Sequence, residues 1–149
     1  MKKQFIISSF AAGIMFASNF ATAQSAPFSR VIEANGVIYL AGHLGRDAQT
    51  RLYGSTMGAQ TKATLENIGA TLETVNASHA DIVRCQVFMT DISKFSEMNA
   101  AYRTFFPSTP PARTTVGVAA LAAPDALIEI ECTAVRGHGS KVKAIKDTK

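Results

Sequence analysis

The 149-residue chain has no tryptophan, only two cysteines, five prolines and ten glycines. Proline and glycine are too scarce for a collagen-like or low-complexity chain, and 47% hydrophobic residues are too many for a disordered one. No segment repeats at a fixed period, which excludes solenoids and propellers. The length and composition therefore predict one globular domain with a single core.

The chain also lacks the short motifs of the commonest enzyme classes. It has no nucleophile elbow, phosphate-binding loop, dinucleotide fingerprint or zincin helix. The two cysteines and three histidines show no metal-ligand spacing, and an isolated histidine is most often structural or solvated. We therefore expect neither a metal nor a cofactor.

The 15 lysines and arginines slightly outnumber the 11 aspartates and glutamates, which gives a net charge of +4. Most of the excess lies at the two ends, in Lys2, Lys3, Lys141, Lys143, Lys146 and Lys149. The balanced centre has no basic patch interleaved with aromatics, so we expect no nucleic-acid partner. Residues 137–149, glycine- and lysine-rich, are expected to form a flexible basic tail.

The N-terminus has the three parts of a secretory signal peptide. Lys2 and Lys3 precede an uncharged, mostly apolar stretch that extends to small residues ending at Ala23. A membrane anchor is the alternative, but polar residues interrupt a stretch that is shorter than the roughly 20 residues needed to span a bilayer. We predict a signal peptide at 1–23, a domain at 24–136, and export to the periplasm or beyond with no stable membrane association after cleavage.

Export leaves two interpretations of Cys85 and Cys132, which both lie in apolar, alternating segments. An oxidising compartment allows a disulfide between them. Two buried thiols are at least as compatible with the sequence, which does not show whether their Cα atoms are close.

Hydrophobic periodicity and turn residues predict seven elements in the order β, β, α, β, α, β, β. Asn35-Gly36 predicts a hairpin turn, glycines make 42–58 a loop, and three prolines from Pro107 onward end the second helix. The predicted strands are 29–33, 37–41, 81–90, 113–118 and 127–135, and the helices are 57–75 and 92–105.

This order predicts an α+β fold, with two helices on one face of a mostly antiparallel sheet. The second helix would carry one apolar face through Ile92, Phe95, Met98, Tyr102 and Phe105. The strands also hold Val, Ile and Phe on both sides, so the other sheet face would be apolar and exposed. We therefore expect a homo-oligomer that buries that face.

Two features could carry chemistry. Arg113 follows a rigid Pro-Pro-Ala turn at the start of a strand, where it could grip a carboxylate with two hydrogen bonds. A solvated or salt-bridged surface arginine is the alternative. Glu129 and Glu131 lie on one side of an apolar strand, where one could act as an acid or base and the other as a structural ion-pair partner.

Six segments in order along the chain carry a family resemblance: APFS, VIYLAGH, LENI, VFMTD, PART and IEIE. Together they resemble the RidA/YjgF/UK114 family, and the resemblance runs from Ala26 to Arg136. It implies chorismate-mutase-like subunits whose sheets form the central barrel of a homotrimer, with three ligand clefts between neighbours. It also implies cofactor-free hydrolysis of 2-aminoacrylate and other 2-imino acids to 2-keto acids and ammonia.

The resemblance assigns roles to four residues. Arg113 would hold the substrate carboxylate, and Glu129 would position the attacking water and shuttle its proton. Asn99 would line the cleft, and Gly42 would lie where backbone groups border it.

Three further cleft positions depart from the common bacterial pattern. Phe28 stands where tyrosine is common, Ala41 where serine is common, and Thr115 where cysteine is common. The pocket would be more apolar and would select differently shaped imines. A non-catalytic trimeric small-molecule binder or chaperone-like protein is the alternative, and an endoribonuclease ranks last because the basic residues cluster in the tail.

Overall fold

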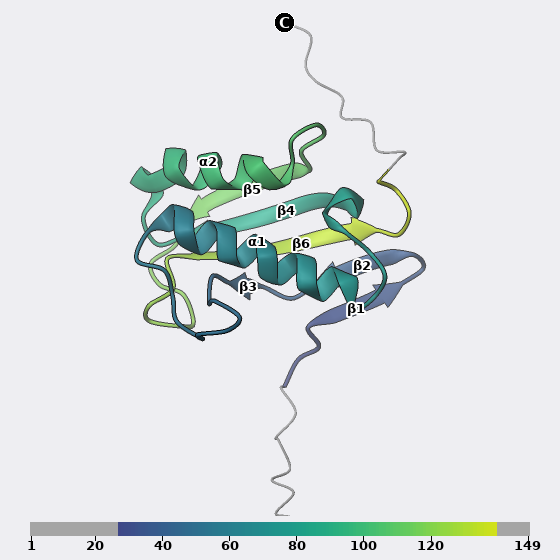
Figure 1. Cartoon of the computed structure of the whole chain (residues 1–149), viewed down its shortest axis with the longest axis horizontal. Coiled ribbons are helices and arrows are strands. Elements are labelled where there is room, and N and C mark those ends of the chain that lie inside the picture. Colours follow the sequence, from purple (N-terminus) through teal and green to yellow (C-terminus); the bar gives the residue numbers. More distant parts are fainter. Residues whose placement is uncertain (1–26, 140–149) are drawn as a thin grey trace, which may run out of the picture.

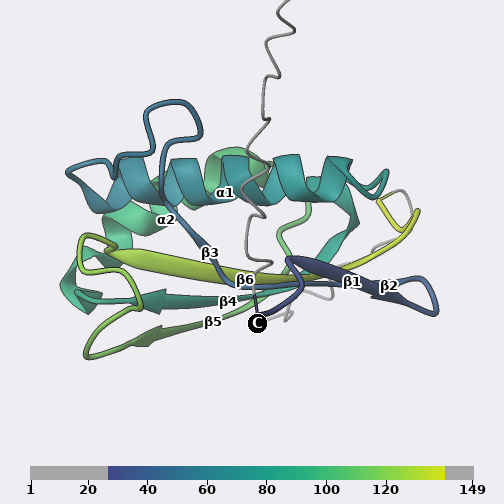
Figure 2. The ribbon, with the colours of Figure 1, turned by 90° about the horizontal axis from the view of Figure 1, so that it is seen from below.

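The structure, a computed structural model, describes residues 27–139. It is a two-layer α+β domain, as predicted, in which helices α1 (Met57–Glu73) and α2 (Phe95–Phe105) pack together over one face of a six-stranded sheet. Figure 1 shows the two helices side by side in front of the sheet, and Figure 2 shows them above it, with no helix of residues 27–139 on the opposite face. The predicted signal peptide and residues 140–149 of the predicted tail lie outside the described residues.

The strands follow the order β1-β2-β6-β4-β5, and β3 pairs with β6 beside β2. Only β4 and β5 run parallel, so the sheet is mostly antiparallel as predicted. The strands are β1 (Val31–Ala34), β2 (Val37–Leu40), β3 (His43–Leu44), β4 (Ile82–Met89), β5 (Ala112–Gly117) and β6 (Ile128–Val135).

The predicted hairpin between β1 and β2 is confirmed. Asn35 and Gly36 both have positive φ, 52° and 79°, which is the backbone of the two-residue turn that matches strand twist. The prediction of a loop over 42–58 is wrong at its start, whereas the predicted helix start at residue 57 is confirmed. His43–Leu44 pairs with β6, and α1 begins at Met57 after the hydroxyl of Thr56 caps its first turn.

The core lies between the helices and the covered sheet face. β6 alternates as predicted: Ile128, Ile130, Cys132 and Ala134 are buried, and the residues between them are half-buried. On β4, Cys85 lies directly opposite Cys132, and the two form a disulfide with their Cα atoms 4.1 Å apart. The structure therefore selects the disulfide over the two buried thiols.

The second helix is shorter than predicted, and only part of its predicted apolar face is buried. Ile92 lies in a 3₁₀ turn (Ile92–Lys94) capped by the carboxylate of Asp91, and α2 begins only at Phe95. Ile92 and Phe95 are exposed, whereas Met98 and Tyr102 are buried. The buried face of α2 is therefore formed by Met98 and Tyr102 and not by the residues before them.

The uncovered sheet face is mixed rather than apolar, which corrects the expectation from composition. Register and alternation place Ile32, Tyr39 and Val116 on it, and all three are exposed. The same face also carries Arg84, Gln86, Thr114, Glu129 and Glu131. Within 27–139, no helix is long and apolar enough to cross a membrane.

Candidate functional site

Arg113 lies on the helix-covered side of β5, where residues of α2 hold its guanidinium. The guanidinium carbon is 4.7 Å from the ring centroid of Tyr102 and 5.6 Å from that of Phe95. Its Nη1 donates to the sulfur of Met98 at 3.9 Å. A cation over two aromatic faces is held in place without a carboxylate, so its donors stay available to a ligand.

The guanidinium opens into a cleft of about 380 Å³, here called the Arg113 cleft. Its lining residues come from α2 and the proline-rich turn before β5: Asn99, Tyr102, Arg103, Phe106, Pro110, Pro111 and Arg113. Asn99 and Arg113, two of the predicted site residues, thus line the same cleft. Because the described residues place no carboxylate within ion-pairing distance of Arg113, the cleft suits a small anion from outside.

Two buried hydroxyls beside the Arg113 cleft have no hydrogen-bond partner among the described residues. They are Tyr102 Oη and Thr115 Oγ1. Burial raises the pKa of Tyr102 to about 12 against a smaller opposing effect of Arg113, so the phenol remains a donor at neutral pH. Sequence reasoning gave Tyr102 only a packing role, although its i, i+3 relation to Asn99 on one helix was the available signal.

Glu129 lies on the other face of the sheet. It is half-buried on β6, opposite Leu44 of β3 and Phe88 of β4. The burial of Glu129 raises the pKa of its carboxyl group, and the charge of Glu131 raises it further. A carboxylate whose pKa is raised binds a proton more tightly than an ordinary one, which suits it to taking a proton from water.

Gly42 makes room for this carboxylate. A Cβ built on Gly42 would overlap the carboxyl group of Glu129, so only glycine fits there without moving Glu129. The structure therefore brings these two predicted residues together. The preceding residue, Ala41, is half-buried, and its carbonyl accepts a hydrogen bond from Nδ1 of His43 at 2.7 Å.

Phe28 and Thr115 lie differently. Phe28 lies just before β1 and is 61% exposed. Within one chain its ring therefore does not close off a pocket. Thr115 is half-buried on the covered side of β5, two residues after Arg113. Thr115, which stands where the family commonly has cysteine, thus lies on the same face of the sheet as Arg113.

One chain does not bring Arg113 and Glu129 together. Arg113 contacts α2 on the covered face, whereas Glu129 lies on the uncovered face. Strand β4 also separates β5 from β6. Each chain thus holds an anion anchor and a carboxylate on opposite faces, and in residues 27–139 no three potential ligands gather into a metal site.

The fold and the cleft define a small α+β domain with an arginine-lined pocket at the sheet edge. The family described as Endoribonuclease L-PSP matches residues 19–136, which is most of the chain. The chain therefore belongs to this family, which includes the reactive-intermediate deaminases and YjgF.

Relatives with functional names are identical to this chain at about a third of the aligned residues. The chain is 36% identical over 115 residues to chloroplastic Reactive Intermediate Deaminase A of Arabidopsis thaliana, covering 76% of this chain but 61% of that longer protein. It is 35% identical over 118 residues to 2-iminobutanoate/2-iminopropanoate deaminase of Bos taurus, covering 78% of this chain and 85% of the bovine one.

A solved relative has the same fold. Escherichia coli TdcF, crystallised with bound serine, superimposes with a TM-score of 0.71 at 30% identity, covering 76% of this chain and 91% of that one. The predicted family and fold class are thereby confirmed.

Proposed function

We propose that the protein hydrolyses reactive enamine and imine intermediates, 2-aminoacrylate and other 2-imino acids, to 2-keto acids and ammonia. The single observation that carries this proposal is the Arg113 cleft, where an arginine with no carboxylate partner among residues 27–139 lies beside Asn99 in a small pocket. Relatives named as deaminases of this class, at about 35% identity, support it.

The chemistry requires a carboxylate anchor, a positioned water and a group that moves both protons of that water to the nitrogen in turn. The guanidinium of Arg113 binds the substrate carboxylate, and Asn99 borders the bound imine. The oxygen of water adds to the C=N carbon while Glu129 takes a proton from the water. Glu129 returns this proton to the nitrogen, which gives an adduct with one hydroxyl and one amino group on the same carbon. A second proton then passes from that hydroxyl through Glu129 to the nitrogen as the C–N bond breaks, which leaves ammonia and the C=O of the keto acid. The enamine 2-aminoacrylate enters this sequence as its imine tautomer, after a proton has moved from nitrogen to the methylene carbon.

The proposal requires a second chain, because Arg113 and Glu129 lie on opposite faces of one sheet. We propose a homotrimer in which the uncovered face of each sheet lies inward. The Arg113 cleft of one subunit then meets the Glu129 and Gly42 of its neighbour. The exposed Ile32, Tyr39 and Val116 supply apolar area for such an interface, and light scattering of residues 24–149 tests its stoichiometry.

We further propose export, on the sequence pattern of residues 1–23. The disulfide between Cys85 and Cys132 supports an oxidising compartment, since disulfides persist there and rarely in the cytosol. An exported deaminase needs an exported source of imines. The class of reaction that supplies one is the oxidation of an amino acid at its α-carbon.

The test is the release of ammonia and keto acid from imines that an amino-acid oxidase generates in situ, over several side chains. Wild type should accelerate release above the buffer rate, and Arg113→Ala should abolish the acceleration. Because imines also hydrolyse unaided, each rate is compared with oxidase alone.

Two results overturn the proposal. If wild type and Arg113→Ala both match the buffer rate for every imine, the protein is not a deaminase of this class. Binding of 2-keto acids without turnover then favours the alternative, a non-catalytic trimeric small-molecule binder. If Arg113→Ala keeps full acceleration, the chemistry lies elsewhere on the chain.

A further inference from the structure

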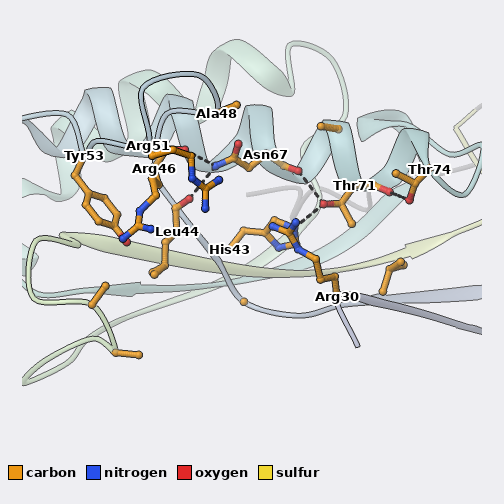
Figure 3. A pocket seen from close by; sticks show the side chains of 15 residues that line it. Arg30, His43, Leu44, Arg46, Ala48, Arg51, Tyr53, Asn67, Thr71 and Thr74 are labelled. Atoms are coloured by element: carbon orange, nitrogen blue, oxygen red, sulfur yellow. Dashed lines mark hydrogen bonds between the residues drawn. The ribbon is translucent and has the colours of Figure 1, made fainter. Parts of the chain in front are cut away.

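A second cavity lies between α1 and the strands β1 to β3 (Figure 3). Its volume is about 630 Å³. None of its lining residues lines the Arg113 cleft of the same chain, but Gly42, which lies against Glu129, is one of them. The cavity is therefore distinct from the Arg113 cleft within one chain and adjoins the Glu129 half of the proposed active site.

Three arginines line this second cavity, and no lining residue is acidic. They are Arg30, Arg46 and Arg51. In the described part of the chain, none of the three lies within ion-pairing distance of a carboxylate. Figure 3 shows Arg46 and Arg51 toward one end of the cavity and Arg30 toward the other, beside His43. Three cations around one cavity repel each other unless an anion lies between them.

The arginines at one end are held by the fold. The guanidinium carbon of Arg46 lies 5.0 Å from the ring centroid of Tyr53, and Arg46 and Tyr53 also form a β-bridge. The side-chain amide of Asn67 on α1 donates to the carbonyls of Leu44 and Arg46 at 3.0 and 2.9 Å. This backbone is therefore fixed against the helix.

The acid nearest in sequence does not neutralise these arginines. One carboxylate oxygen of Asp47 accepts hydrogen bonds from the amides of Gln49 and Thr50 and from the hydroxyl of Thr50. The carboxylate is thus used to close its own turn. The positive charge of the cavity remains without a counter-ion among the described residues.

Arg51 is held in a backbone conformation that its residue type disfavours. Its φ is 63°, in the left-handed region that glycine and asparagine adopt more readily than other residues. The chain nevertheless has a long cationic side chain there, directed at the cavity. Strained positions of this kind cluster at ligand sites.

We propose that this cavity, the arginine pocket, binds a small organic anion with at least two oxyanion groups, carboxylate or phosphate. A guanidinium grips one oxyanion through two parallel N–H donors, and arginines at both ends of the pocket favour a ligand with an anionic group at each end. This site goes beyond the proposed deaminase function, because its three arginines have no role there, although Gly42 lines the pocket and also borders Glu129.

Calorimetric titration of the full chain at constant ionic strength tests the proposal. Pyrophosphate and citrate serve as the phosphate and carboxylate probes, and acetate serves as the single-charge comparison. We expect saturable binding of one or both polyanions, at one per subunit, and binding of acetate at least tenfold weaker. Whichever polyanion binds tighter identifies the oxyanion class. The absence of saturable heat for both overturns the proposal.

Variants assign any observed binding to the pocket. Arg51→Gly and Arg46→Gln should each weaken polyanion binding at least fivefold. Lys94→Gln is the matched control because it removes one charge from an exposed position outside both pockets, and it should change affinity less than twofold. Equal weakening by all three variants would show non-specific attraction and would overturn the proposal.

Two further readouts separate this site from the deaminase site and from unfolding. Arg113→Ala should leave polyanion affinity within twofold, and loss of binding in that variant alone would place the anion in the Arg113 cleft instead. Arg51→Gly should melt no lower than wild type without ligand, since glycine suits the φ of 63°. A lower melting temperature would contradict the assignment of strain.

Discussion

The Arg113 cleft and the Glu129 side of the sheet hold their charges in opposite ways. The guanidinium of Arg113 lies over two aromatic rings, with no carboxylate beside it in the described chain. Glu129 has a second carboxylate, Glu131, as its charged neighbour, and burial adds to the cost of its own charge. One region is thus an unpaired cation on a rigid support, and the other is an unpaired anion. Under the proposed function these are the two halves of one site, and a single chain keeps them on opposite faces of its sheet.

The disulfide lies between the two halves. Cys85 pairs with Cys132 of β6 and, on its other side, with Arg113 of β5. We expect its reduction to lower the free energy of unfolding by about 4 kcal/mol, because it closes a loop of 47 residues in the unfolded chain. Urea unfolding of oxidised and reduced protein measures this, with a Cys85→Ala, Cys132→Ala double variant as control. Equal midpoints for all three forms would mean that the bond adds no stability.

Arg113→Lys tests the Arg113 half. We expect a loss of about 100-fold in kcat/KM on 2-imino acids, or about 2.7 kcal/mol, because an ammonium lacks the planar fork that grips a carboxylate. Arg136→Lys makes the same change at an arginine paired with Glu33 and should leave kcat/KM within twofold. A fully active Arg113→Lys variant would show that only the charge is needed, not the fork.

Gly42→Ala tests the carboxylate half. Its Cβ would displace the carboxyl group of Glu129, so we expect turnover to fall about tenfold, or about 1.4 kcal/mol. Gly117→Ala is the control, since the nearest atom to its Cβ is at 3.5 Å, an ordinary contact. Steady-state rates on the same imine compare the two. Equal rates would remove Glu129 from the mechanism.

The smallest expected effect is that of Glu129→Gln on the melting temperature. The raised pKa of Glu129 means that the folded state binds this proton more tightly than the unfolded state. Wild-type stability therefore falls as pH rises above the group's ordinary value of 4.5, and the variant escapes this loss. Melting temperatures should favour Glu129→Gln increasingly from pH 5 to 7, relative to Glu73→Gln at the exposed end of α1. The opposite trend would mean that the charged form is stabilised.

The sequence predicted those parts of the fold that depend on local patterns. The alternation along β6 reports directly which residues face the helices, and Asn35-Gly36 specifies its turn through positive φ. The two-residue strand β3 has no such pattern, since it exists only through pairing with β6, more than 80 residues later. The disulfide depends in the same way on the register between β4 and β6.

The candidate site was predictable in its members but not in its arrangement. The family resemblance selected Arg113, Asn99, Gly42 and Glu129, and the structure pairs the first two in one cleft and the last two against each other. That the pairs lie on opposite faces follows from register across β4, which no local pattern encodes. Tyr102 was missed as a cleft residue because a buried aromatic on a helix is usually core.

The central claim is that each active site combines Arg113 of one subunit with Glu129 of another. Arg113→Ala and Glu129→Gln chains, each inactive alone, can be unfolded, mixed in equal amounts and refolded together. If each site lies between two neighbouring subunits of a trimer, a site is intact only when one neighbour keeps Arg113 and the other keeps Glu129. In an equal random mixture this holds for about a quarter of the sites, so turnover should recover to about a quarter of wild type. A mixture no more active than either parent would contradict a shared site.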